Sequence, residues 1–202
     1  MNPTGRKMPA IAKRRATYVD IEALPPNMVG EILDGEFVIT PVMPSTRVAV
    51  AANSLAGEPG GPFQKRAAPN ARWIFLPKPE LHFGQTVVVP DLAGWRRERM
   101  PTLPEKVGST IAPDWICEVL SPSTASYDRT AKLRLYHQQK VGHLWYLDPA
   151  YRTLEAFGWS EPHWLTLGTF ADFEAVSAPP FEGLSIDLGV LWPFDRPEGC
   201  PA

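Results

Sequence analysis

Two carboxylates lie inside strongly apolar parts of the sequence. Asp91 ends the run 87–91 (Val-Val-Val-Pro-Asp), and Glu118 lies within 115–120 (Trp-Ile-Cys-Glu-Val-Leu). A carboxylate in an apolar, β-prone run loses its water, so it needs a cation or a strong hydrogen-bond partner. Two strand-borne carboxylates that face one cleft can hold a divalent metal, and a lysine such as Lys132 can then orient a water or stabilise charge on a phosphate. These residues predict a metal-dependent phosphodiesterase site.

A strand–helix–strand unit is predicted around the second of these carboxylates. The apolar run 115–120 predicts a buried strand, the segment 121–124 (Ser-Pro-Ser-Thr) ends it, and a helix follows over about 126–140. Gly142 ends that helix, and the apolar residues 144–147 predict a second strand. Such a crossover is right-handed, so the helix should lie on one face of the sheet.

Shorter elements are predicted on both sides of this unit. Asp-Gly at 34–35 between two β-prone runs is a strong signal for a two-residue hairpin. Ser45 predicts the start of a helix that Gly57 would end, followed by a Gly/Pro-rich loop to about residue 70. The order of elements predicts an α/β domain with a mixed β-sheet core flanked by helices and an additional antiparallel meander. The other predicted elements are a short helix over 18–24, strands over 72–76, 80–83, 86–89 and 91–95, a loop over 96–113, the meander over 153–159 and 163–169, and a closing segment over 184–192.

The composition is that of an ordinary globular domain. The 202 residues are 44% hydrophobic and 21% charged, which suits one domain with a well-formed core. A net charge of -2 argues against an extended, non-specific nucleic-acid surface, although local charge still allows DNA as a substrate. No apolar run approaches the roughly 20 residues that span a bilayer, and no signal-peptide segment follows the basic N-terminus. We therefore expect a cytoplasmic protein without membrane contact.

Four blocks of residues carry a family resemblance. They are Gly-Glu-Ile-Leu-Asp-Gly-Glu at 30–36, Val-Pro-Asp-Leu-Ala-Gly-Trp at 89–95, Ala-Pro-Asp-Trp-Ile-Cys-Glu-Val-Leu-Ser-Pro-Ser-Thr at 112–124, and Lys132, Tyr136 and Gly-His-Leu-Trp at 142–145. The set resembles the Uma-two family, restriction-endonuclease-like members of the PD-(D/E)XK nuclease superfamily. The resemblance runs from about residue 18 to 192. It implies a restriction-endonuclease-like fold and Mg²⁺-dependent cleavage of DNA phosphodiesters, with Mn²⁺ as the alternative metal.

The resemblance also implies roles for individual residues. Asp91 matches the superfamily's Pro-Asp aspartate and Glu118 its second acidic residue, so these two would bind the metal. The superfamily's lysine usually lies two residues past that glutamate, where this chain has Leu120. Lys132 would supply it from the following helix; the alternative is a solvated lysine that pairs with the residue four positions earlier. Glu31 would join the catalytic site, and the alternative is an exposed hairpin carboxylate.

Three arginines are candidates for nucleic-acid contacts. Many relatives carry a histidine at the start of the predicted helix after Ser45, where Arg47 could instead contact a phosphate. Arg96 and Arg97 directly follow the Asp91 strand, and we predict that they bind the DNA backbone at the edge of the cleft. A solvated loop is the alternative for this pair.

The favoured hypothesis is a Mg²⁺-dependent endodeoxyribonuclease that acts on DNA as a homodimer. The rival hypothesis is a catalytically silent module of the same fold that binds DNA or a protein partner, and a hydrolase of other phosphate esters is a third. We expect residues 1–17 to form a disordered basic arm, 18–192 the restriction-endonuclease-like domain and 193–202 a C-terminal tail.

Overall fold

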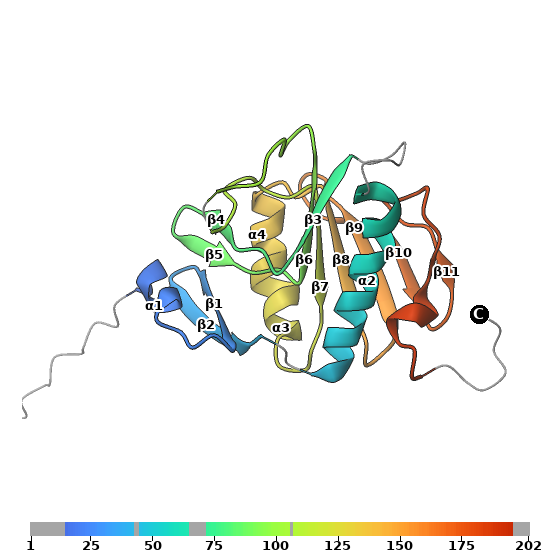
Figure 1. Ribbon diagram of the computed structural model, residues 1–202, viewed down its shortest axis with the longest axis horizontal. Coiled ribbons are helices and arrows are strands. Elements are labelled where there is room, and N and C mark those ends of the chain that lie inside the picture. Colours follow the sequence, from blue (N-terminus) through green and yellow to red (C-terminus); the bar gives the residue numbers. More distant parts are fainter. Residues whose placement is uncertain (1–14, 43–44, 65–71, 106, 196–202) are drawn as a thin grey trace, which may run out of the picture.

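A six-stranded mixed sheet forms the centre of the computed structural model, which describes residues 15–42, 45–64, 72–105 and 107–195 (Figure 1). Its strand order is β10-β9-β8-β7-β6-β3. Only β7 and β8 run parallel within it, as expected for strands joined through a helix. The strands are β3 (Trp73–Pro77), β6 (Leu92–Arg96), β7 (Trp115–Val119), β8 (His143–Asp148), β9 (Thr153–Gly158) and β10 (Leu165–Ala171).

A second sheet of four strands lies beside the N-terminal helix α1 (Tyr18–Glu22) (Figure 1). Its hairpin turns at Asp34 and Gly35, whose φ angles of 53° and 80° suit the turn that a two-residue hairpin needs. The predicted hairpin is therefore confirmed. In the order β2-β1-β5-β4 the strands are β2 (Glu36–Pro41), β1 (Met28–Leu33), β5 (Thr86–Val88) and β4 (Leu81–Phe83).

Helices cover both faces of the central sheet. Helix α2 (Thr46–Gln64) packs on one face, with β11 (Ala175–Val176), β12 (Ile186–Asp187) and the 3₁₀ helix η2 (Leu188–Leu191) near it. On the other face, α3 (Ala125–Tyr127), the π-helical turn η1 (Asp128–Lys132) and α4 (Leu133–Gln138) form one continuous helical segment. The described helices include none that is long and apolar enough to cross a membrane. The predicted α/β fold with flanking helices and an antiparallel meander, β8-β9-β10, is confirmed.

The predicted end of the second helix is wrong. Ser45 does begin α2, since its hydroxyl accepts a hydrogen bond from Val48 N at 3.3 Å, but the helix passes Gly57 and continues to Gln64. A glycine ends a helix when it takes a left-handed conformation, and Gly57 is not among the glycines with positive φ. The first part of the predicted loop to residue 70 is therefore helix; residues 65–71 lie outside the described ranges.

Alternation along β7 divides the apolar residues between the two faces. Trp115, Cys117 and Val119 pack toward α2, whereas Ile116 and Leu120 pack toward α4. Glu118 shares the second face, because side chains two positions apart on a strand point the same way. The strand therefore carries one carboxylate into an otherwise apolar layer between sheet and helix.

Candidate active site

The Glu118 carboxylate is enclosed by groups that donate hydrogen bonds to it. Its residue is 2% exposed, and its Oε1 accepts from Tyr136 Oη at 2.5 Å and forms an ion pair with Lys132 Nζ at 2.9 Å. Tyr136 lies four residues after Lys132, so both side chains occupy one stripe of the helical segment. A buried carboxylate is stable only with such partners. The sequence hypothesis that Lys132 points to the end of β7 is confirmed.

Lys132 lies at the centre of three carboxylates. Its Nζ is 2.9 Å from Glu118 Oε1, 3.0 Å from Glu31 Oε1 and 3.4 Å from Asp128 Oδ1, and its side chain is 4% exposed. The π turn that carries Asp128 and Lys132 brings both side chains to the sheet side of the helix. The alternative of a solvated lysine is wrong, because the Lys132 side chain is buried. The ion pair with Asp128 that this alternative assumed is present.

Asp91 meets Glu118 across neighbouring strands. The register of β6 and β7 pairs Leu92 with Cys117, so one further step sets Asp91 opposite Glu118. Directly opposed residues of antiparallel strands have Cβ atoms about 4.5–5.5 Å apart. Asp91 Oδ2 accepts from Val119 N at 2.8 Å, and its Oδ1 accepts from Lys78 Nζ at 2.7 Å. The two predicted metal ligands therefore lie together.

Glu31 reaches the same site from the second sheet. It is 4% exposed, and its Oε1 accepts from Val89 N at 2.7 Å as well as from Lys132. The alternative of an exposed hairpin carboxylate is therefore wrong. Because β1 also pairs with β5 through Ile32 and Val87, the sheet pairing fixes this carboxylate close to the Pro-Asp segment.

Two charged members of the site were missed by the sequence reasoning. Asp128 was considered only as the partner of a solvated lysine, although its spacing of four from Lys132 was a usable signal. No local sequence pattern indicated Lys78, because this residue reaches Asp91 only through the pairing of β3 with β6. Both line one small pocket of about 40 Å³, here called the carboxylate pocket. The charged residues that line it are Glu31, Lys78, Asp91, Glu118, Asp128 and Lys132.

The electrostatics of the carboxylate pocket are dominated by burial and by excess negative charge. Burial raises the pKa of Glu118 to about 8 against the opposing ammonium of Lys132, and the carboxylates of Asp128, Asp91 and Glu31 raise it further. Burial alone would lower the pKa of Lys132, but Glu118, Glu31 and their neighbours raise it well above its usual value. The surrounding carboxylates therefore favour the charged form of Lys132.

The donor set fits a divalent cation. Four carboxylates face two ammonium groups, so acidic side chains outnumber basic ones, and a further cation would favour the charged form of Glu118 against its burial. Within the described ranges no three Asp, Glu, His or Cys side chains are arranged to hold an ion by themselves. Mg²⁺ commonly binds through only one or two carboxylates and completes its shell with water and phosphate oxygens. Asp91 and Glu118 suffice for that mode.

The basic run after Asp91 lies at the other end of its strand. Arg96 ends β6, and Arg97 N donates to Arg72 O at 2.7 Å. The two lie roughly 16 and 20 Å along the strand from Asp91, at about 3.3 Å per residue. Both are exposed, and the Arg96 guanidinium lies over the Trp73 ring, 5.2 Å from its centroid. The expectation that this run borders the cleft is wrong, because β6 leads away from the carboxylates. Contact of these arginines with nucleic acid stays a prediction.

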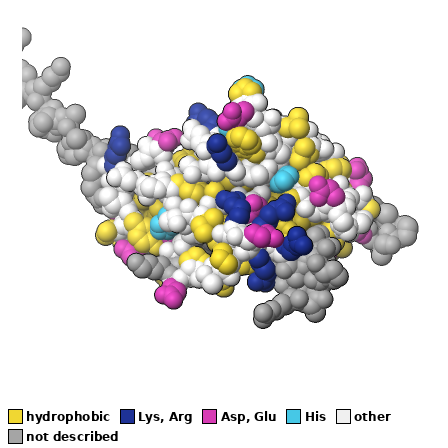
Figure 2. Space-filling view, turned by 90° about the horizontal axis from the view of Figure 1, so that it is seen from above, with side chains coloured by type: hydrophobic (Ala, Val, Ile, Leu, Met, Phe, Trp, Pro, Cys, Tyr) yellow, Lys and Arg dark blue, Asp and Glu magenta, His cyan; other side chains and the backbone are white. Residues whose placement is uncertain are grey.

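Asp114, the second Pro-Asp aspartate, lies at that same distant end. Its carboxylate accepts from Arg96 N at 2.8 Å and from Arg99 Nη1 at 2.9 Å, so it is occupied far from Glu118. Figure 2 looks onto this end of the sheet, where Lys and Arg side chains gather around Asp and Glu side chains. The end is thus a mixture of both charges.

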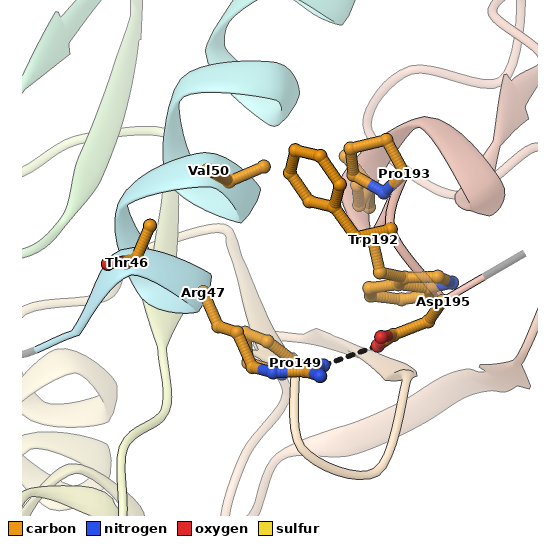
Figure 3. A pocket seen from close by; sticks show the side chains of 9 residues that line it. Thr46, Arg47, Val50, Pro149, Trp192, Pro193 and Asp195 are labelled. Atoms are coloured by element: carbon orange, nitrogen blue, oxygen red, sulfur yellow. Dashed lines mark hydrogen bonds and ion pairs between the residues drawn. The ribbon is translucent and has the colours of Figure 1, made fainter.

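Arg47 makes an ion pair within the chain. Its guanidinium donates to Asp195 across an apolar pocket formed by the first turn of α2 and the segment after η2, which includes Trp192 (Figure 3). Arg47 remains 63% exposed in its side chain. A phosphate contact by Arg47 stays a prediction, and it would compete with Asp195.

The hydroxyl of Tyr136 is the buried donor whose removal is simplest to test. We expect Tyr136→Phe to lower the free energy of unfolding by about 1–3 kcal/mol, because Glu118 loses a buried hydrogen bond. Urea denaturation measures the change. Tyr151→Phe, at a tyrosine that is 77% exposed, is the matched control and should leave stability unchanged. Equal midpoints for both variants would contradict a stabilising role of the Tyr136 hydroxyl.

Comparisons with known proteins identify a family and a related fold. The chain matches the family model Uma2, whose description is "Putative restriction endonuclease", over residues 16–189. Among solved structures it is similar to one described as "a putative nuclease belonging to DUF820" from Anabaena variabilis, with a TM-score of 0.69, 20% identity, and coverage of 88% of this chain and 98% of that chain. At this identity the likeness shows a shared fold. A comparison with curated proteins finds no match.

Proposed function

Because the chain belongs to the Uma-two (Uma2) family, we propose that it is a Mg²⁺-dependent nuclease that hydrolyses phosphodiester bonds of DNA. The observation that carries the proposal is the carboxylate pocket, in which Asp91 and Glu118 meet across two strands beside a buried lysine. The excess of carboxylates over ammonium groups in this pocket favours a divalent cation there. A homodimer would supply two such sites, one for each strand of a duplex.

Each residue of the pocket has a distinct part in this proposal. Asp91 and Glu118 would hold the cation, which when bound lowers the pKa of a water and neutralises charge on the phosphate. Glu31 and Asp128 hold the Lys132 ammonium next to Glu118. Of the three carboxylate contacts of Lys132, that to Asp128 is the longest at 3.4 Å, so it is the one that a water or phosphate oxygen replaces most easily.

Lys132 is suited to act on the attacking water and on the phosphate. It stays charged in a desolvated site, where a fixed positive charge stabilises a developing negative charge more strongly than in water. Its ammonium donates to the same oxygen of Glu118 as Tyr136 does, so its position is fixed before any substrate arrives. This pre-organisation supports the role of a residue that orients water.

A catalytically silent module that binds DNA or a protein is the second candidate. The observation in its favour is that Lys132 already lies among three carboxylates, as an internal cation would. In this alternative the Lys132 ammonium takes the place of a metal and offsets part of the carboxylate charge without any chemistry. The two candidates differ in whether the pocket takes up a divalent cation.

Metal binding and plasmid nicking together separate the candidates. We expect calorimetry to detect binding of Mg²⁺ or Mn²⁺ to the wild type and not to Glu118→Ala, because one of the two ligands is lost. The wild type should also nick supercoiled plasmid only with the metal. Glu155→Ala, which removes a half-exposed carboxylate paired with Arg129 outside the pocket, is the control and should behave as the wild type. Equal metal binding by wild type and Glu118→Ala without nicking would favour the silent module.

A further inference from the structure

Lys78 joins the site from the strand next to Asp91. It follows β3 directly, and its backbone N donates to Asp91 O at 2.9 Å, so the pairing of β3 with β6 extends by one residue to these two. Its Nζ then donates to Asp91 Oδ1 at 2.7 Å. Lys78 is therefore bound to Asp91 through both its backbone and its side chain.

The backbone at Lys78 is held in an uncommon conformation. Its φ of 45° is left-handed, which is unusual for a residue other than glycine, and Pro77 and Pro79 flank it. Of the four other described non-glycine residues with positive φ, Asp34 and Arg152 lie in turns between paired strands. Residues held in such conformations cluster at functional sites, where the surrounding structure maintains them. At Lys78 this backbone conformation directs the side chain toward Asp91.

Lys78 differs from Lys132 in its access to solvent. Its side chain is 34% exposed, against 4% for Lys132. Among the described residues that line the carboxylate pocket, these two carry positive charge. Lys132 has three carboxylate acceptors around its three N–H groups, whereas Lys78 has one in Asp91, which leaves N–H groups of Lys78 free to meet an incoming anion.

Lys78 also lies where the carboxylate pocket meets a larger opening. An apolar groove of about 390 Å³ runs along α2, and Lys78 and Asp91 line both this groove and the carboxylate pocket. The other groove residues include Val48, Ala52 and Leu92. An anion that approaches the carboxylates through this opening therefore meets Lys78 at its boundary, and a cation there offsets the repulsion by the carboxylates.

We propose that Lys78 is a substrate-binding residue that holds a phosphate of the nucleic-acid strand at the mouth of the carboxylate pocket. This inference rests on the proposed function. The ammonium keeps its contact with Asp91 and uses its remaining donors on the phosphate. Lys78 thus links Asp91, which would hold the cation, to the nucleic-acid strand that is to be cut. Its role is in substrate binding, whereas the role of Lys132 is in the chemical step.

The test measures binding of a short fluorescent DNA duplex in Ca²⁺ by anisotropy over a series of salt concentrations, with the duplex verified as uncut on a gel. We expect Lys78→Met to weaken binding roughly tenfold, since one charged hydrogen bond is lost, and to reduce the slope of log affinity against log salt by about 1. Lys78→Arg should retain the slope. Lys140→Met, at an exposed lysine outside both cavities, is the matched control and should equal the wild type.

The outcomes separate this inference from the proposed function. If Lys78→Met keeps the wild-type slope and affinity, Lys78 does not contact a phosphate, and the nuclease proposal is unaffected. If the variant instead loses Ca²⁺ affinity in calorimetry with an unchanged slope, Lys78 only positions Asp91, which also overturns the inference. A wild type that binds no DNA overturns both proposals. If Lys78→Met reduces the slope while the wild type never cuts DNA in Mg²⁺, the result supports the role of Lys78 and overturns the nuclease proposal.

Discussion

Asp91→Asn is expected to reduce metal-dependent plasmid nicking on the order of 10³-fold, comparable to the loss of one main electrostatic contact to a transition state. The substitution keeps the shape of the side chain and removes its charge. Asp91 Oδ2 can still accept from Val119 N at 2.8 Å through an amide oxygen, so the link between β6 and β7 persists. The loss should therefore appear in activity and in metal affinity. The melting temperature should fall only slightly, because the Lys78–Asp91 ion pair that the substitution breaks is partly exposed.

The chain offers its own control for this substitution. Asp114 follows a proline as Asp91 does, but it pairs with Arg99 at the opposite end of the sheet. Asp114→Asn should nick plasmid at the wild-type rate. If both variants lose activity equally, the pocket at Asp91 is not the site of chemistry. If neither does, the proposed metal ligands are wrong.

Lys132→Met should give the largest loss of stability. The variant leaves Glu31, Glu118 and Asp128 buried without their shared cation, and breaking a buried ion pair by removing one partner costs about 3–5 kcal/mol. For a chain of this size that corresponds to a fall in melting temperature on the order of 10 °C. Thermal denaturation followed by circular dichroism measures it. Lys140→Met is again the exposed control.

A double variant tests the electrostatic reason for this effect. Lys132→Met combined with Glu118→Gln also removes one of the buried carboxylate charges that have lost their cation. The double variant should therefore be more stable than Lys132→Met alone, because substitutions at two residues in contact are not additive. Nicking should remain lost in both. A Lys132→Met protein as stable as the wild type would mean that the carboxylates take up protons at little cost, and the lysine would then have no structural role.

The local sequence pattern predicted those parts of the site that depend on interactions between residues close together in the chain. Glu118 inside an apolar strand required buried partners, and alternation along that strand fixed the face on which they lie. The Asp-Gly hairpin followed from its backbone requirement, which in turn brings Glu31 to the second sheet. The family resemblance indicated Lys132. Composition alone did not indicate that this lysine is buried among three carboxylates.

The failures came from the relation between distant segments. Arg96 and Arg97 follow Asp91 closely in sequence, but β6 lies between them. Because a strand is extended, residues at its two ends are far apart in space. Lys78 is near Asp91 only because β3 pairs with β6, and no local pattern reveals strand partners. Gly57 failed as a helix end because the conformation of a glycine depends on its tertiary surroundings.

The π turn over Asp128–Lys132 makes the helix locally one residue wider than a regular one. A deletion between Asp128 and Lys132 would restore an ordinary helical turn and leave α4 in nearly the same orientation, because the turn itself takes up the extra residue. The spacing of four between Asp128 and Lys132, which now brings both side chains to the sheet, would then become three. A redesign guided by helical regularity alone would tend to erase this irregularity and, with it, the joint approach of a carboxylate and an ammonium to β7.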